Sequence, residues 1–364
     1  MQGKLYPLGG TVCYPFLFIL HHHWNYDMKK NMVFVLYFLA STSGLAQNPT
    51  EESIALYYQG QINGKWNIEM HLSLVEDVLS GSYAYTSQNK SIPIRGSLLE
   101  NRFTASEYDA AGRIIGTFKG ELDEFDHIQG IWRSADGRKE YAFSLERMGP
   151  KNRLTTTYPH QFILKKDPFP YEARFSVATC EEDICSGLAT INLYDISGKL
   201  VQTLFSDDLY MTLDENQKPS VNVILGYDEQ SALIFDDFNF DGKADIAIRN
   251  GNMGGYGSPT YDVYLYSQNR FVFHIPLSLL VMENLGMFQT DAKRRILTTF
   301  TKSGCCWHQT SENGWQNNKI IPLKRITEDA TGSNEKVVVT TEIWTGKMWK
   351  KSVKTYLQSA YYKE

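Results

Sequence analysis

The residues with the clearest chemistry lie in one short acidic segment, residues 237–245. Side chains with oxygen atoms occupy its first, third, fifth and ninth positions, and glycine occupies the sixth. When such a segment coils, these oxygens turn toward one centre, the glycine allows a sharp turn, and the seventh position offers its backbone carbonyl. The spacing predicts a site for one structural calcium ion, held by Asp237, Asn239, Asp241, the carbonyl of Lys243, and Asp245.

The chemistry of these donors favours calcium over zinc or copper, because all of them are hard oxygen ligands. The segment is shorter than an EF-hand loop, since its twelfth position is Ile248 and not a glutamate. It is typical of the calcium loops between strands of extracellular β domains. The alternative is a solvated hairpin turn without a metal ion.

A glycine-rich segment, residues 250–261, follows directly. It has neither the GxxxxGK[ST] pattern of a phosphate loop nor the GxSxG pattern of a nucleophile elbow. Its length and its aromatic residue predict a protruding recognition loop in which Tyr256, Ser258 and Tyr261 contact a partner. The alternative is a plain connection between strands, with Tyr261 packed inside.

Four cysteines follow the leader described below, and an exported chain can oxidise them. Cys180 and Cys185 flank a four-residue loop, which predicts a disulfide between them. Cys305 and Cys306 are adjacent, so they form a strained bridge with each other or each reaches back to the first pair. A zinc site with His308 is a competing interpretation, but no second CxxC-like pair supports it.

No catalytic constellation is evident, and the sequence predicts a protein that is not an enzyme. The histidines show no HExxH spacing. Glu107 with Asp109, and Glu121 with Asp123 and Glu124, fall at predicted strand ends and turns, where carboxylates are usually only solvated. We therefore predict no catalytic residues.

Residues 47–149 predict a small up-and-down β-barrel. Short alternating segments closed by turn residues recur about every ten positions, which is typical of strands joined by tight hairpins. The predicted strands are 54–59, 66–74, 81–85, 91–99, 102–108, 113–119, 128–133 and 141–146. Two short stretches, 81–85 and 130–132, resemble avidin-type barrels, which implies a fold and nothing more. The interior of such a barrel is filled by side chains or holds one small ligand.

Residues 150–170 contain several prolines and predict a linker, and residues 171–364 predict a larger antiparallel, propeller-like β domain around the calcium loop. The chain is thus expected to be all-β. The predicted strands are 188–194, 200–205, 221–225, 232–235, 244–249, 261–267, 270–274, 296–302, 319–326, 336–344 and 347–357. One short helix is predicted at 276–285.

The segment from Met28 to Ala46 has the order of a secretory signal peptide: two lysines, a short apolar run and small residues. We expect a mature chain from about residue 47, located in the periplasm or secreted, with residues 1–27 as translated upstream sequence. The apolar run is too short to span a bilayer. The net charge of −5, without a long basic run, gives no support to nucleic-acid binding.

Three segments together resemble a bacterial periplasmic family: 233–247 around the acidic loop, the glycine-rich segment, and Lys-Ser-Gly-Cys-Cys-Trp-His at 302–308. Its best-known members are calcium-binding, propeller-like immunity proteins that inhibit lysozyme-like toxins delivered by an antibacterial type IV secretion system. The resemblance covers residues 220–325 and implies the fold and the calcium site. In related inhibitors a Ser-Gly-x-Tyr-like loop enters the enzyme cleft; residues 257–261 are similar, in a different order and spacing.

These observations favour an exported calcium-binding β protein that binds a protein target such as a lysozyme-like peptidoglycan hydrolase. A second hypothesis is a pair of carbohydrate- or surface-binding modules, with aromatic residues of the barrel rim lining the glycan site. A third is a secreted hydrolase, for which a cleft with converging carboxylates is required.

Overall fold

The computed structural model describes residues 53–75, 77–88, 90–99, 101–123, 126–148, 157–225, 230–332 and 335–362. The predicted signal peptide and upstream segment lie outside the described residues. The described chain is all-β, as predicted, with twenty-two strands. Its helical elements are η2 (Gly255–Gly257), α1 (Ile275–Met282) and α2 (Gln358–Tyr361).

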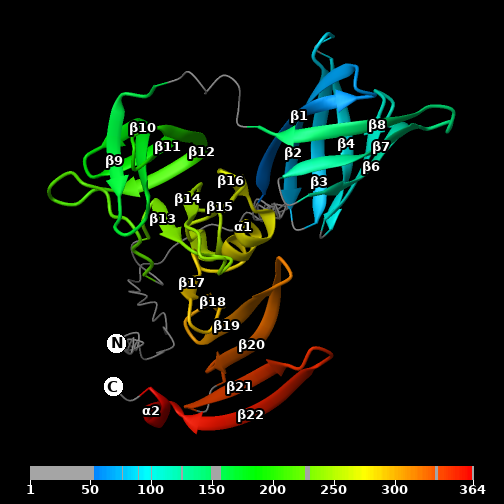
Figure 1. The fold of residues 1–364 in the computed structure, drawn as a ribbon. Coiled ribbons are helices and arrows are strands. Elements are labelled where there is room, and N and C mark those ends of the chain that lie inside the picture. Colours follow the sequence, from blue (N-terminus) through cyan, green and yellow to red (C-terminus); the bar gives the residue numbers. More distant parts are fainter. Residues whose placement is uncertain are drawn as a thin grey trace, which may run out of the picture.

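Eight strands form a closed up-and-down barrel, which confirms the prediction for the first region (Figure 1). Each strand pairs antiparallel with the next, and the first closes on the last. The strands are β1 (Ile54–Ile62), β2 (Trp66–Val75), β3 (Val78–Tyr85), β4 (Ser91–Leu99), β5 (Arg102–Tyr108), β6 (Ile114–Leu122), β7 (His127–Ser134) and β8 (Glu140–Arg147).

The barrel interior is filled mostly by apolar side chains. Glu107 is an exception: its carboxylate is buried and accepts the Tyr83 hydroxyl, so the expectation that it is solvated at a strand end is wrong. Strand alternation turns every second residue inward, and Met70, Phe103, Phe118 and Leu145 are completely buried there. At its curved walls neighbouring strands approach closely: a Cβ added to Gly96 would lie 1.8 Å from the carbonyl oxygen of Thr104. The glycine is required at this close approach of two strands.

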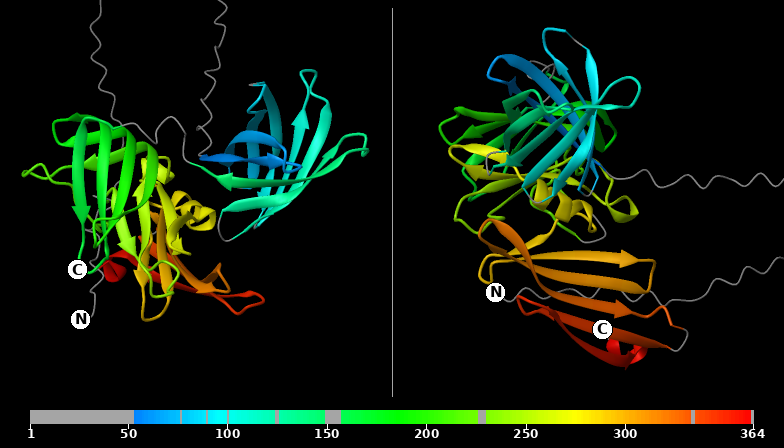
Figure 2. Two further views of the ribbon diagram at one scale, coloured as in Figure 1. Left: turned by 45° about the horizontal axis from the view of Figure 1, so that its top comes forward. Right: turned by 90° about the vertical axis from the view of Figure 1, so that its right-hand side faces the viewer.

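The second region consists of three antiparallel sheets in which strands adjacent in sequence are adjacent in the sheet. In the right-hand view of Figure 2 the second of these sheets, in yellow, lies between the barrel and the third sheet, in orange and red. The first sheet is β9 (His160–Lys165), β10 (Tyr171–Glu181), β11 (Ile184–Asp195) and β12 (Leu200–Thr212). The second is β13 (Leu233–Asp236), β14 (Asp245–Arg249), β15 (Tyr261–Ser267) and β16 (Arg270–Phe273). The third is β17 (Gln289–Asp291), β18 (Ile296–Ser303), β19 (Trp307–Gln316), β20 (Lys319–Asp329), β21 (Lys336–Trp344) and β22 (Trp349–Leu357).

The first sheet begins earlier than the sequence suggested. Strand β9 lies within the predicted linker, 150–170, and pairs with β10 over six residues. Residues 149–156 lie outside the described residues. The predicted helix is present as α1, where His274 accepts the first free backbone N–H, that of Leu277, at 3.2 Å and Pro276 fits the first turn.

The barrel packs directly on the second region. The Arg147 guanidinium, at the end of β8, lies 3.3 Å from the centroid of the Phe273 ring of β16. One cluster of buried apolar residues includes side chains of the barrel and of the first two sheets. Within the described part of the chain, the helices are all too short or too polar to cross a bilayer.

Candidate functional site

The predicted calcium loop connects β13 to β14 and is coiled tightly by its own side chains. Asp237 accepts the backbone N–H groups of Asp241 at 2.9 Å and Gly242 at 2.8 Å. Gly242 has a φ of 87°, which a residue with a side chain rarely adopts. Asp245 is completely buried and accepts the N–H of Phe238 at 2.8 Å, so its carboxylate reaches back across the loop.

The loop brings several carboxylates into one short segment, where their negative charges raise the cost of ionisation. Burial raises the pKa of Asp245 to about 8, and the charges of Asp241 and Asp237 add to this effect, while N–H donors from Tyr266 and Phe238 oppose it. The Lys243 ammonium lies 4.0 Å from Asp241. A hard cation fits this all-oxygen set of donors, because it would neutralise carboxylates that repel one another.

The carboxylates are nevertheless held on backbone donors and not gathered around one point. Across the described ranges, no three His, Cys, Asp or Glu side chains are grouped as metal ligands. The calcium site therefore stays a prediction that rests on the type of donors and the turn of the backbone.

The glycine-rich segment begins at the other end of β14, so the two predicted sites are roughly 13 Å apart along five strand residues. It is held by backbone hydrogen bonds, including Gly251 to the Asp208 carbonyl at 2.6 Å and Thr260 to the Gly251 carbonyl at 3.1 Å. Gly251 and Gly257 have φ values of 94° and 70°. These glycines allow backbone conformations that residues with a side chain rarely adopt, so the segment follows a defined course.

Tyr256 is the exposed tip of this segment, with 66% of its surface accessible. It has a φ of 61°, which is uncommon for a residue with a side chain. Its hydroxyl accepts the N–H of Gly304, and the Lys302 ammonium lies 4.9 Å from its ring centroid. The structure thus joins the glycine-rich segment to the turn after β18, two segments that the sequence could only treat separately.

Two of the predicted contact residues have other roles. Tyr261 is 2% exposed and donates its hydroxyl to the Ser231 carbonyl at 2.7 Å, so the prediction that it contacts a partner is wrong. Its position at the start of β15 turns the ring into the core. Ser258 is partly buried and donates its hydroxyl to the Asn284 carbonyl at 3.1 Å, which holds the segment against the end of α1.

The disulfide between Cys180 and Cys185 is present, as predicted, and joins the ends of β10 and β11. Because these two cysteines are bridged to each other, the alternative in which Cys305 and Cys306 reach back to them is excluded. Cys305 is exposed in the turn beside Tyr256.

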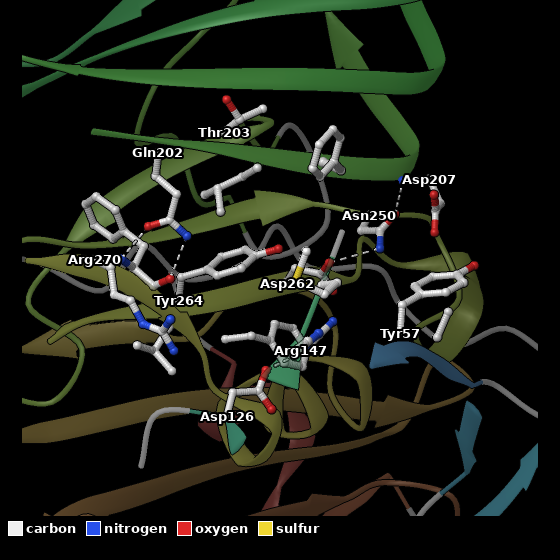
Figure 3. Close-up of a pocket in the computed structure, with 17 residues that line it drawn as sticks. Tyr57, Asp126, Arg147, Gln202, Thr203, Asp207, Asn250, Asp262, Tyr264 and Arg270 are labelled. Atoms are coloured by element: carbon white, nitrogen blue, oxygen red, sulfur yellow. Dashed lines mark hydrogen bonds and ion pairs between the residues drawn. The ribbon is translucent and has the colours of Figure 1, made fainter. Parts of the chain in front are cut away.

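A cavity of about 140 Å³ lies where the barrel meets the second region, and sequence reasoning missed it (Figure 3). At its centre Arg147 forms a 3.5 Å ion pair with Asp126, which also accepts the Tyr58 hydroxyl at 2.8 Å. On the opposite wall Asn250 donates to Asp262 at 3.2 Å. We call these residues the interdomain joint: Tyr58, Asp126, Arg147, Asn250 and Asp262.

Burial controls the charges in the joint. It raises the pKa of Asp126 to about 6 and that of Asp262 to about 6, although the neighbouring Arg147 lowers both. Burial opposes the charge of Arg147, but Asp126 and other nearby groups hold the pKa of the guanidinium above its ordinary value. The ionised arginine and the ionised forms of the two carboxylates therefore stabilise one another.

The joint has the converging carboxylates that a hydrolase needs, but its size and bonding point to a structural role. Ligand pockets usually occupy roughly 300–1,000 Å³, whereas a cavity of about 140 Å³ holds only a few waters. The joint draws its residues from distant parts of the chain, so no local pattern could reveal it. Asp262 alone gave a signal, as a carboxylate within the apolar run of β15.

Comparisons with known proteins give only distant likenesses. No family model matches the chain, and no curated protein does. A Xanthomonas type IV secretion system related protein is 20% identical with a TM-score of 0.40, over 65% of this chain and 98% of that one. Transferrin binding protein B from Haemophilus parasuis is 9% identical with a TM-score of 0.20, over 84% of this chain and 76% of that one. Intact Ap-TbpB is 8% identical with a TM-score of 0.21, over 85% and 78%. None of these likenesses carries weight for fold or function.

Proposed function

We propose that this chain is an exported binding protein whose second region recognises a protein target. The contact surface is the tip surface, which consists of Met253, Tyr256, Lys302, Gly304 and Cys305. One observation carries the proposal: the exposed Tyr256 ring is fixed in place by a hydrogen bond from Gly304 on a separate segment. A large exposed side chain that is already ordered loses little conformational entropy when it binds.

The tip surface has the composition of a protein contact. Tyr256 offers a large apolar ring with a polar end, the property that makes tyrosine frequent at the energetic centres of interfaces. Met253, 41% exposed, adds an adaptable apolar side chain. The segment connects β14 to β15, and connections of this kind often carry recognition residues on a rigid scaffold.

The target that we propose is a lysozyme-like peptidoglycan hydrolase, which is what the resemblance of the three segments implies. Two of those segments meet at the tip surface, which supports treating them as a single contact surface. Each of the two carboxylates of the interdomain joint is held by a neighbouring side chain, which favours a binding protein over a hydrolase.

The carbohydrate-binding alternative is less well supported by the barrel rim. Trp132 stacks on Tyr141 with ring centroids 5.7 Å apart, and Trp66 meets Tyr141 edge-on at 5.1 Å. These rings pack on one another, so the faces that they share are not offered to a sugar.

We also propose that the loop at 237–245 binds one structural calcium ion. Its oxygen donors and the positive φ of Gly242 support this, as does the buried carboxylate of Asp245. Asp237, Asn239, Asp241, the carbonyl of Lys243, and Asp245 would hold the ion. The ion would supply positive charge to the loop and stabilise the entry into β14, at the end remote from the tip surface.

The binding proposal is tested by inhibition of lysozymes of several types with wild-type protein, Tyr256→Ala, and the matched control Tyr362→Ala. Tyr362 is also exposed, at 44%, but lies near the C-terminus. Wild type and the control should inhibit at least one enzyme equally, whereas Tyr256→Ala should inhibit roughly thirtyfold less well, as expected for loss of a central interface tyrosine. If wild type inhibits none of them, the proposed target is wrong, and a glycan array then tests the alternative.

A further inference from the structure

The hairpin of β21 and β22 ends in a turn at residues 345–348 that stands at the outer edge of the third sheet (Figure 1). Strand β22 pairs with β21 on one side and is the last strand of that sheet. The turn is well defined: Thr345 donates its backbone N–H to the Met348 carbonyl at 3.1 Å, and its hydroxyl donates to the same carbonyl at 2.8 Å. Gly346, with a φ of 85°, completes it.

The tip of this hairpin carries apolar and aromatic side chains on the protein surface. Trp344 and Trp349 face each other across the two strands, with ring centroids 5.4 Å apart. Met348 is 64% exposed and Ile343 is 51% exposed. Exposure of these apolar side chains to water is unfavourable. Clusters of exposed apolar side chains often mark surfaces that bind a membrane or another protein.

The same hairpin is strongly basic. Residues 336–357 contain five lysines and one glutamate, a net charge of +4 in a chain whose overall charge is −5. Three of the lysines, Lys347, Lys350 and Lys351, lie within three residues of Met348. The Arg325 guanidinium, from the adjacent strand β20, lies 4.5 Å from the centroid of the Trp349 ring. The positive charge is thus concentrated around the exposed apolar side chains.

Protection of a sheet edge explains only part of this pattern. Lysines on an edge strand discourage pairing with another chain, which accounts for Lys350, Lys351 and Lys354 on β22. It does not account for the exposed Met348 and the paired tryptophans at the turn. A soluble polyanion would neutralise the charge of the lysines but would leave these apolar side chains exposed to water. A bilayer surface, which offers negative charge above an apolar layer, suits the whole tip.

We propose that this hairpin tip docks on the surface of an anionic lipid bilayer. Tryptophan rings are favoured at the level of the headgroups, and lysines near them are attracted by the negative surface potential. Met348 and Ile343 reach the boundary of the acyl chains, while the lysines contact lipid phosphates. The second region is thereby held at a membrane, independently of what the tip surface around Tyr256 binds.

The test is cosedimentation of the full mature chain with vesicles. One set contains phosphatidylcholine alone, and the other contains equal parts of phosphatidylcholine and phosphatidylglycerol. Three variants accompany wild type: Lys350→Gln with Lys351→Gln; Met348→Ser; and a matched control, Lys65→Gln with Lys199→Gln, which removes the same charge from exposed turns elsewhere. All the substituted residues are on the surface, so folding should be retained, and thermal melting checks this.

Wild type and the control should sediment with the anionic vesicles and not with phosphatidylcholine alone. Loss of two lysines should weaken binding roughly twentyfold or more, at about fivefold for each lysine near an anionic surface. Met348→Ser should weaken it several-fold. The proposal is overturned if wild type does not bind the anionic vesicles, if it binds both kinds equally, or if the control loses as much as the hairpin variant. It is also overturned if Met348→Ser binds as wild type does, since the hairpin would then be a general polyanion contact.

Discussion

The interdomain joint and the tip surface show two opposite uses of polar and aromatic side chains. In the joint, Asp126 and Arg147 are buried and bonded to each other, and the Arg147 guanidinium covers the Phe273 ring. At the tip, Tyr256 has one fixed hydrogen bond and leaves two thirds of its surface in water. A buried ion pair of this kind ties two parts of the fold together, whereas an ordered side chain left exposed is available to a partner. Substitutions in the joint and at the tip surface test whether this difference in roles holds.

The largest effect is expected from Arg147→Ala. It removes the cation that faces two buried carboxylates and leaves the Asp126 carboxyl buried without its partner. Loss of one member of a buried ion pair typically costs about 3–5 kcal/mol of unfolding free energy. Urea denaturation at neutral pH measures this loss, with Arg133→Ala, an exposed barrel arginine, as the control. A change below about 1 kcal/mol, the range of an exposed ion pair, would show that the joint is not a structural element.

Calcium should have the next largest effect. An ion that binds only the folded chain adds about 2.7 kcal/mol of stability at a free concentration a hundredfold above its dissociation constant. Excess calcium should therefore raise the melting temperature relative to chelator, and Asp241→Ala should abolish the difference. Asp214→Ala, in a different acidic turn, serves as the control. An unchanged melting temperature in wild type would mean that the loop is only a solvated turn.

The third prediction concerns pH and the joint. The pKa of Asp262 is raised by burial to about 6 from its ordinary value of 3.8, so the folded chain keeps this proton at pH values where the unfolded chain has lost it. Its contribution to stability is therefore full at low pH and is lost as pH rises from about 4 to 6. Asp262→Asn, which stays neutral, should be more stable than wild type by on the order of 1–2 kcal/mol at neutral pH. The difference should close by about pH 4. A variant less stable than wild type at neutral pH would show that attraction to Arg147 outweighs burial.

The smallest effect on stability is expected at the tip. Tyr256→Ala should change the unfolding free energy by no more than about 0.5 kcal/mol, because most of the ring is in water. Chemical denaturation beside Tyr261→Ala, which removes a buried ring from the same segment, gives the contrast. The buried substitution should cost about 3–5 kcal/mol. If the two variants lost similar stability, Tyr256 would be a packing residue and not a contact residue.

The barrel could be predicted closely because each strand carries its own alternation and its own turn. Strand β19 could not, since its sequence from Trp307 to Gln316 is mostly polar and becomes a strand only through pairing with β18 and β20. The reverse error concerns residues 221–225, whose apolar composition predicted a strand. There, Ile224 makes a single bridge to Gln230. Whether such short segments form strands depends on the segments that pair with them. Those partners cannot be identified from a local sequence pattern.

The candidate sites, like the strands, could be predicted only where their residues are close in sequence. The Cys180–Cys185 disulfide depends on residues close in sequence, so their spacing was enough to predict it. The calcium site in the acidic loop rests on the same kind of spacing and stays a prediction. The joint assembles Asp126, Arg147 and Asp262 from separate strands and loops, and no spacing relates them. Tyr256 was predicted as exposed from its glycine neighbours. Its hydrogen bond with Gly304 required the fold, as did the burial of Tyr261.

The most direct test of the role of the tip surface is amide hydrogen exchange of the chain with and without a lysozyme-like hydrolase, the proposed target. Bound target should protect residues 250–258 and 302–306, and should leave exchange in the barrel and the interdomain joint unchanged. Tyr256→Ala should remove this protection at the same concentrations. Protection confined to the barrel mouth or the joint, with none at Tyr256, would contradict the assignment of the tip surface as the recognition element.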